Sequence, residues 1–116
     1  MSDLFICAAG RDRSPHAADV ARELAHNAGY KDYFSDYWGM YNSDFEVPTK
    51  AKLEGFDRIF VMDERMSRDL QKNYSVPAEK IINLDVADTS AREKHFKDLL
   101  RKELTEKLTP YFPKSI

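Results

Sequence analysis

The chain has 116 residues, a length that suits one domain with one hydrophobic core. Its 18 basic and 20 acidic residues give a net charge of −2, which argues against a nucleic-acid partner. The single cysteine, Cys7, excludes an internal disulfide, and no Cys/His cluster has zinc spacing. Neither a signal peptide nor a membrane span is recognisable. We therefore expect one soluble, cytoplasmic domain over residues 1–116, with no metal, cofactor or membrane partner.

The first third of the chain predicts a strand, a helix and a second strand. Leu4–Ala8 is a short apolar run, typical of a strand buried on both faces. A helix is expected to begin at Ser14, a good N-cap residue that precedes Pro15, and to stop at Gly29. The aromatic-rich segment that follows predicts a strand over residues 33–37.

The rest of the chain continues the alternation. It predicts a short helix at 48–53, a strand at 57–62, a helix at 63–73, a strand at 80–84 and a last helix at 92–108. The residues of the last helix expected to face inward are Phe96, Leu99, Leu100, Leu104 and Leu108. Strands that alternate with helices predict a parallel sheet covered on both faces, which is a three-layer α/β sandwich.

Two loops leave strand ends with side chains suited to chemistry, at residues 7–14 and 85–91. Ligands of parallel sheets sit beyond the carboxyl ends of the strands, close to helix N-termini. In the first loop, backbone N–H groups can converge on an anion, and Gly10 makes a positive φ cheap. The planar fork of Arg13 can hold two phosphate oxygens. The predicted phosphate-binding residues beside Arg13 are Ala8, Ala9, Gly10, Arg11, Asp12 and Ser14.

The same loop places Cys7 where its thiolate is favoured. Inward N–H groups, the helix dipole and Arg13 all stabilise a negative charge on the sulfur. A thiolate beneath a bound phosphate is a nucleophile, and the Ser14 hydroxyl can donate a hydrogen bond to it. The competing interpretation is a buried structural cysteine followed by a surface turn.

Four stretches of the sequence resemble the low-molecular-weight protein tyrosine phosphatases, and in particular their short bacterial members: Leu4–Cys7, Arg13–Ala17, Phe56–Met62 and Ile81–Leu84. The resemblance implies a four-stranded parallel sheet flanked by helices. It also implies metal-independent hydrolysis of a phosphomonoester through a phosphocysteine intermediate. The substrate would be a phosphorylated protein or a small phosphomonoester, and inorganic phosphate would be released.

The resemblance also implies a general acid in the second loop. The matching stretch is Val86-Ala87-Asp88-Thr89, which assigns that role to Asp88, with Asp85 as the second choice. An acid has to reach the leaving group from the side opposite the nucleophile, and this loop leaves the same sheet edge. The alternative is that Asp88 only caps a turn or the last helix.

The loops also depart from the family pattern. Ala9 and Gly10 replace the usual Gly and Asn, and Asp12 stands where a second cysteine is common. Thr89 and Ser90 replace the aromatic residues that often wall the pocket. The candidates for a replacement wall are Tyr37, Trp38 and Tyr41, of which Trp38 is taken as substrate-binding.

These departures leave other functions open. One is a non-catalytic phosphate or phosphoprotein binder on the same fold, and another is a phosphatase directed at a nucleotide. A third is an arsenate reductase. The single cysteine makes an internal thiol relay impossible, so only an external thiol would serve that reaction.

Overall fold

The computed structural model describes residues 1–8, 13–41, 50–87 and 94–114, with the backbone alone for 94–96. Its four strands are β1 (Ser2–Cys7), β2 (Phe34–Gly39), β3 (Arg58–Val61) and β4 (Ile81–Asn83). All pair in parallel, in the order β2-β1-β3-β4. The predicted parallel sheet is therefore confirmed, with β1 between β2 and β3.

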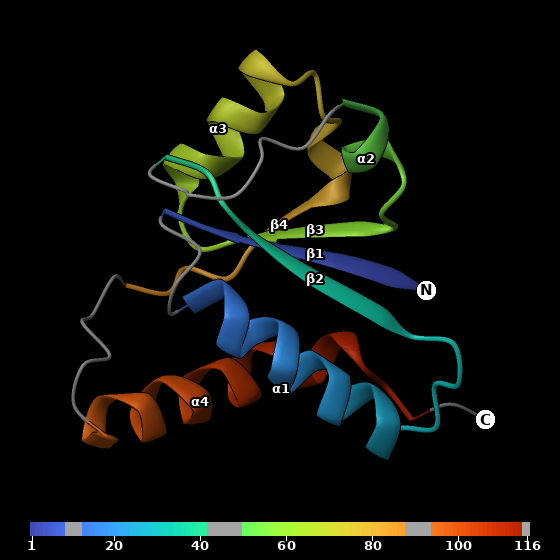
Figure 1. The fold of residues 1–116 in the computed structure, drawn as a ribbon, viewed down its shortest axis with the longest axis vertical. Coiled ribbons are helices and arrows are strands. Elements are labelled where there is room, and N and C mark those ends of the chain that lie inside the picture. Colours follow the sequence, from blue (N-terminus) through green and yellow to red (C-terminus); the bar gives the residue numbers. More distant parts are fainter. Residues whose placement is uncertain (9–12, 42–49, 88–93, 115–116) are drawn as a thin grey trace.

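Helices cover both faces of this sheet (Figure 1). The helices α1 (Arg13–Asn27) and α4 (Lys94–Leu108) lie on one face, and α2 (Lys50–Glu54) and α3 (Glu64–Asn73) lie on the other. Two short 3₁₀ helices are η1 (Ala78–Lys80) and η2 (Thr109–Tyr111). The three-layer sandwich predicted from the alternation is confirmed. None of the helices in the described part of the chain is long and apolar enough to cross a membrane.

The parallel register puts the carboxyl ends of the strands at one edge. Cys7, the last residue of β1, is paired with Gly39, the last residue of β2. On the other side of β1, Ile6 is paired with Val61, and Val61 in turn with Asn83. The carboxyl ends of all four strands therefore meet beside the first turn of α1. The loops predicted to carry the chemistry leave from this edge.

The inner face of α4 differs in one residue from the prediction. Leu100, Leu104 and Leu108 are buried, whereas Leu99 is 49% exposed. Residues spaced by four form one stripe along a helix, and Leu99 lies about 100° around the axis from Leu100. The inward placement of Leu99 was therefore wrong, and the side chain of Phe96 lies outside the described residues.

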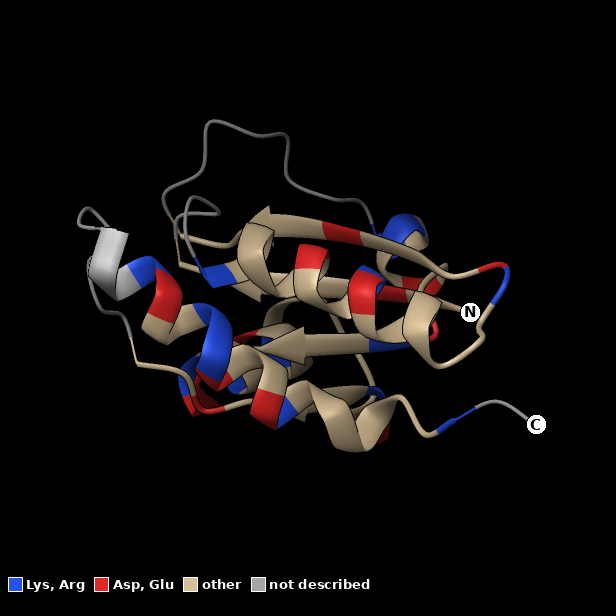
Figure 2. Cartoon of the chain, turned by 90° about the horizontal axis from the view of Figure 1, so that it is seen from below, with Lys and Arg blue, Asp and Glu red and all other residues tan. Residues whose placement is uncertain are grey.

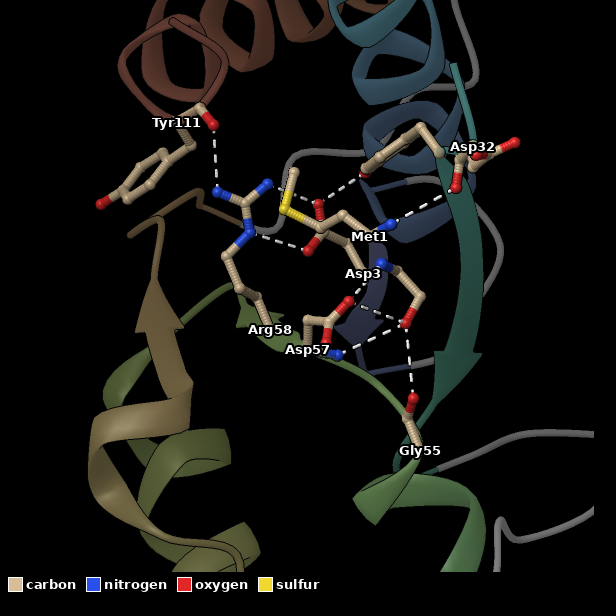
Figure 3. Close-up of polar contacts among 9 residues, drawn as sticks. Met1, Asp3, Asp32, Gly55, Asp57, Arg58 and Tyr111 are labelled. Carbon is tan, nitrogen blue, oxygen red and sulfur yellow. Dashed lines mark hydrogen bonds and ion pairs between the residues drawn. The ribbon is translucent and has the colours of Figure 1, made fainter. Parts of the chain in front are cut away.

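A buried polar network closes the opposite, amino-terminal end of the sheet (Figure 3). Asp3 of β1 is completely buried, and Arg58 of β3 grips both of its carboxylate oxygens at 2.8 Å. The Tyr33 hydroxyl donates to the same carboxylate at 2.6 Å. Arg58 also donates to the Tyr111 carbonyl at 3.0 Å, which ties η2 to the sheet. A buried carboxylate is tolerated here because it is paired and fully hydrogen-bonded.

This network predicts a loss of stability in alkali. Burial first, and then the hydrogen bond to Asp3 and its charge, raise the pKa of the Tyr33 phenol well above its ordinary value of 10.0. The neutral phenol is therefore favoured by folding, so its contribution is complete below pH 10 and is lost as the pH rises further. Tyr33→Phe should cost about 1 kcal/mol at pH 8 and flatten the decline of stability above pH 10. Urea unfolding at pH 8–11 measures both effects, and an equally steep decline in the variant would contradict this explanation.

Candidate active site

Cys7 ends the central strand, next to the first turn of α1. The residue is only 3% exposed, and its Sγ lies 3.0 Å from the Ser14 Oγ, within hydrogen-bonding distance. The helix begins at Arg13, so Ser14 lies inside the first turn and not at the N-cap as predicted. From there its hydroxyl points at the sulfur. The strand and the helix predicted on either side of this loop are both present, and the sulfur has a polar partner.

Arg13 connects this helix to the second loop. Its side chain is 4% exposed, and Nη1 donates a hydrogen bond of 2.9 Å to the carbonyl of Val86, just beyond β4. A guanidinium carries five N–H groups in one plane, and this bond uses one of them while fixing the plane. Arg13 is therefore a buried cation at the carboxyl edge of the sheet. It is positioned by a contact between two segments 73 residues apart in sequence.

The start of the second loop is held by bonds on both sides. The Val86 N–H donates to the Met62 carbonyl at 2.9 Å, and the Asp85 N–H donates to the Asn83 side chain at 2.9 Å. Asp85 has φ 53°, a left-handed conformation that Asp accepts more readily than most residues. From α4, the Lys107 ammonium donates to the Asp85 carbonyl at 2.6 Å. These bonds fix the backbone of residues 85 and 86, which precede the predicted acid.

The structure describes only some of the predicted site residues. It brings Cys7, Ala8, Arg13 and Ser14 together at the sheet edge. The residues that lie outside the described ranges are Ala9, Gly10, Arg11, Asp12 and Asp88. The anion nest and the general acid assigned to these positions therefore stay predictions.

Trp38, predicted to contact substrate, lies in the core. It is 4% exposed, and its ring meets that of Tyr74 edge-on, with centroids 5.9 Å apart. Its Nε1 is buried and has no hydrogen-bond partner among the described residues. Of the aromatic residues named for a pocket wall, Tyr37 and Tyr41 are each 38% exposed. Of the three residues named for the wall, only these two tyrosines are therefore accessible.

Tyr41 is the one of these residues whose backbone bonds to the Cys7 loop. The Met40 N–H donates to the Cys7 carbonyl at 2.8 Å, and the Tyr41 N–H donates to the Ala8 carbonyl at 2.9 Å. The Tyr41 hydroxyl donates to Asp69 at 2.5 Å, and the Arg65 guanidinium carbon lies 4.3 Å from the centre of the ring. Burial and then the Asp69 hydrogen bond raise the pKa of Tyr41. Sequence reasoning named Tyr41 but missed its two partners, because their spacing of four places them on one helix face without indicating a contact with Tyr41.

Charge elsewhere on the molecule is mixed. Figure 2 shows Lys and Arg side by side with Asp and Glu along the helices. Between α1 and α4, for example, Arg101 contacts Asp19 at 3.0 Å and Glu23 at 3.3 Å. Anion binding therefore depends on the local groups at the sheet edge. In the described part of the chain, no group of three or more His, Cys, Asp or Glu side chains is placed to hold a metal ion.

No protein-family model and no curated protein sequence matches this chain. Solved structures do match. The C7S mutant of the YwlE arginine phosphatase of Bacillus subtilis, with a phosphorylated active-site serine, superposes with a TM-score of 0.82 at 17% identity, over 96% of this chain and 93% of that one. A low-molecular-weight protein tyrosine phosphatase from T. tengcongensis superposes with a TM-score of 0.77 at 21% identity, over 96% of this chain and 99% of that one.

The tyrosine phosphatase Wzb from Escherichia coli K30 in complex with phosphate gives a TM-score of 0.70 at 16% identity, over 95% of this chain and 94% of that one. The chain is thus an α/β protein in which the cysteine at the end of the first strand contacts the first turn of the following helix. With these likenesses, the fold is that of the low-molecular-weight protein tyrosine phosphatases, as predicted.

The bond from Lys107 to Asp85 makes a prediction about the second loop. Lys107→Met should weaken the fixed backbone at residues 85 and 86, because it removes the contact from α4. Losing one partly exposed hydrogen bond of about 1 kcal/mol corresponds to about fivefold faster amide exchange at Asp85 and Val86. Hydrogen exchange followed by NMR measures this rate.

Lys107 also contacts Glu103 at 2.8 Å, which supplies a matched control. Glu103→Gln removes this ion pair and leaves the bond to Asp85 in place, so exchange at residues 85 and 86 should stay near the wild-type rate. Equal acceleration by both variants would show that the loop responds to the helix surface and not to the Lys107–Asp85 bond.

Proposed function

We propose that residues 1–116 form one catalytic domain, a cysteine-dependent phosphomonoester hydrolase of the protein tyrosine phosphatase type. The observation that carries the proposal is the buried Cys7 sulfur 3.0 Å from the Ser14 hydroxyl, at the sheet edge where Arg13 is also buried. The similar YwlE structure with a phosphorylated active-site serine supports a phosphoryl group carried on the protein, and the Wzb complex supports phosphate binding on this fold.

In the proposed first step, the Cys7 thiolate attacks phosphorus. The S–P bond forms as the P–O bond to the leaving group breaks, and the leaving oxygen takes a proton from Asp88. Arg13 stabilises the charge that develops on the transferring oxygens. In the second step, Asp88 accepts a proton from water, which attacks phosphorus. The S–P bond breaks, and the Ser14 hydroxyl stabilises the departing thiolate as inorganic phosphate leaves.

The chemistry proposed here needs no metal ion or cofactor, because the charge on phosphate is balanced by Arg13, backbone N–H groups and the helix terminus. The substrate is a phosphorylated protein or a small phosphomonoester. A cytoplasmic location fits the proposal, since reducing conditions keep a lone nucleophilic thiol active. The statements on cofactors, substrate and location all depend on the proposed roles of Cys7 and Arg13.

Two substitutions test the nucleophile and the cation. Cys7→Ser should abolish turnover of p-nitrophenyl phosphate, and Arg13→Ala should lower kcat/KM by about 10²–10³-fold because the transition state loses its charge partner. Steady-state kinetics in the presence of EDTA measure both effects without help from a divalent metal. The matched control is Arg22→Ala, which removes an exposed arginine of α1 that pairs with Asp19.

Turnover that survives Cys7→Ser would rule out the phosphocysteine route. A wild-type protein that binds phosphate but turns over no phosphomonoester would instead support the non-catalytic binder. Non-catalytic binding is the second candidate function because Ala9, Gly10 and Asp12 of the first loop depart from the pattern of the phosphatase family.

The leaving group identifies the acid. Asp88→Asn should slow phenyl phosphate by about 10²–10³-fold, and p-nitrophenyl phosphate much less, because a good leaving group needs little protonation. Asp85→Asn is the comparison, since Asp85 is the other carboxylate proposed for this role. A plot of log(kcat/KM), which reports the step in which the leaving group departs, against leaving-group pKa should steepen for the Asp88 variant alone. A steeper plot for the Asp85 variant alone would move the assignment to Asp85.

A further inference from the structure

We propose that Arg65, held over the ring of Tyr41, recognises a second anionic group on the substrate, namely an acidic side chain next to the phosphorylated residue of a peptide. This inference rests on the proposed function and names the substrate class of the same site. It depends on three observations: where Tyr41 lies, how its side chain is held, and which charge is presented there.

Tyr41 lies directly beside the start of the Cys7 loop. The backbone of residues 40 and 41 continues the β2–β1 pairing past the last residue of each strand, with bonds to the Cys7 and Ala8 carbonyls of 2.8 and 2.9 Å. Figure 1 shows β2 ending beside the first turns of α3, on the side of the sheet away from α1. A group placed on Tyr41 is therefore next to the site and on the α3 side of it.

The Tyr41 side chain is fixed by α3. Its hydroxyl donates to Asp69 at 2.5 Å, and the Arg65 guanidinium carbon lies 4.3 Å from the ring centre. Arg65 and Asp69 are four residues apart, so they lie on the same face of this helix. Stacking a guanidinium on an aromatic ring stabilises it in one place and leaves its N–H edges able to donate. Arg65 is thus an exposed cation in contact with the Tyr41 ring.

The charge of Arg65 is not cancelled by an ion pair within the described residues. The nearby carboxylates keep their own charge and accept hydrogen bonds from neutral groups: Asp69 from the Tyr41 hydroxyl, and Asp63, which caps α3, from the Met66 N–H at 3.0 Å. Arg65 itself is exposed. A phosphopeptide bound at Cys7 would carry its flanking side chains over this side of the loop. An acidic residue there would gain a charge-assisted hydrogen bond, whereas a lysine would be repelled.

The test compares two phosphotyrosine peptides that differ only in the flanking residues, Asp and Glu in one, Asn and Gln in the other. An exposed ion pair predicts about two- to fivefold higher kcat/KM for the acidic peptide, a preference that shrinks as salt rises. Arg65→Gln should bring the ratio of the two values close to one. Arg65→Glu should reverse the preference towards a peptide flanked by lysine.

Arg68→Gln is the matched control, because it removes the same charge from the same helix without touching Tyr41. This variant should keep the wild-type ratio. A small aryl phosphate that carries one carboxylate as its second anionic group, compared with phenyl phosphate, shows whether the peptide backbone is needed. If Arg65→Gln changes only the ratio for the small molecules, the anionic group belongs to a small substrate and the peptide assignment is overturned.

Binding keeps this inference separate from catalysis. The Kd values of both peptides for the Cys7→Ser protein give the same ratio without turnover, so a protein inactive as an enzyme still tests the role of Arg65. Turnover with no acidic preference, or an equal loss of preference in the Arg65 and Arg68 variants, overturns the inference alone. A protein that neither hydrolyses nor binds either peptide overturns the proposed function as well.

Discussion

Parallel pairing of β1 with both of its neighbours is the constraint on which the rest of the site depends. It forces the ends of β1, β2, β3 and β4 to one edge, so that a cysteine at position 7 and a loop near residue 86 become neighbours. The bond from Arg13 to the Val86 carbonyl then joins the two loops directly. The residues of one loop alone do not bring it beside the other loop. The pairing of β1 with β3 and of β3 with β4 does so, because it sets where each loop leaves the sheet.

Local sequence patterns were enough to predict most of the fold. The apolar strand that ends at Cys7, the helix predicted at 63–73 and the strand predicted at 80–84 all form, since each has a local sequence pattern of its own. The prediction that Leu99 faces inward failed because the adjacent Leu100, and not Leu99, belongs to the buried stripe of Leu104 and Leu108. Contacts between distant elements left no such pattern. Nothing in the sequence around Lys107 indicates that it bonds to Asp85, and the spacing of Arg65 and Asp69 does not show that Tyr41 lies between them.

The fold alone does not select a substrate. The structures that resemble this chain include an arginine phosphatase and tyrosine phosphatases, at 16–21% identity. The same scaffold thus supports different phosphorylated side chains, and the choice has to be made by residues at the rim of the loop. In this chain Tyr41, which contacts Arg65 and Asp69 of α3, lies beside Ala8, while Trp38, the larger aromatic residue, is buried in the core.

The presence of one thiol in the whole chain has an experimental consequence. A thiol-specific alkylating reagent reports on residue 7 alone, so mass spectrometry of the intact protein measures, without a substrate, the fraction of molecules that have reacted at Cys7. The same fact limits repair. A sulfenic acid formed at that sulfur finds no second cysteine in the chain to condense with, so reactivation requires a small thiol from the surroundings. For the proposed phosphatase, oxidative inhibition and its reversal should therefore follow the thiols available outside the protein and not a second thiol within it.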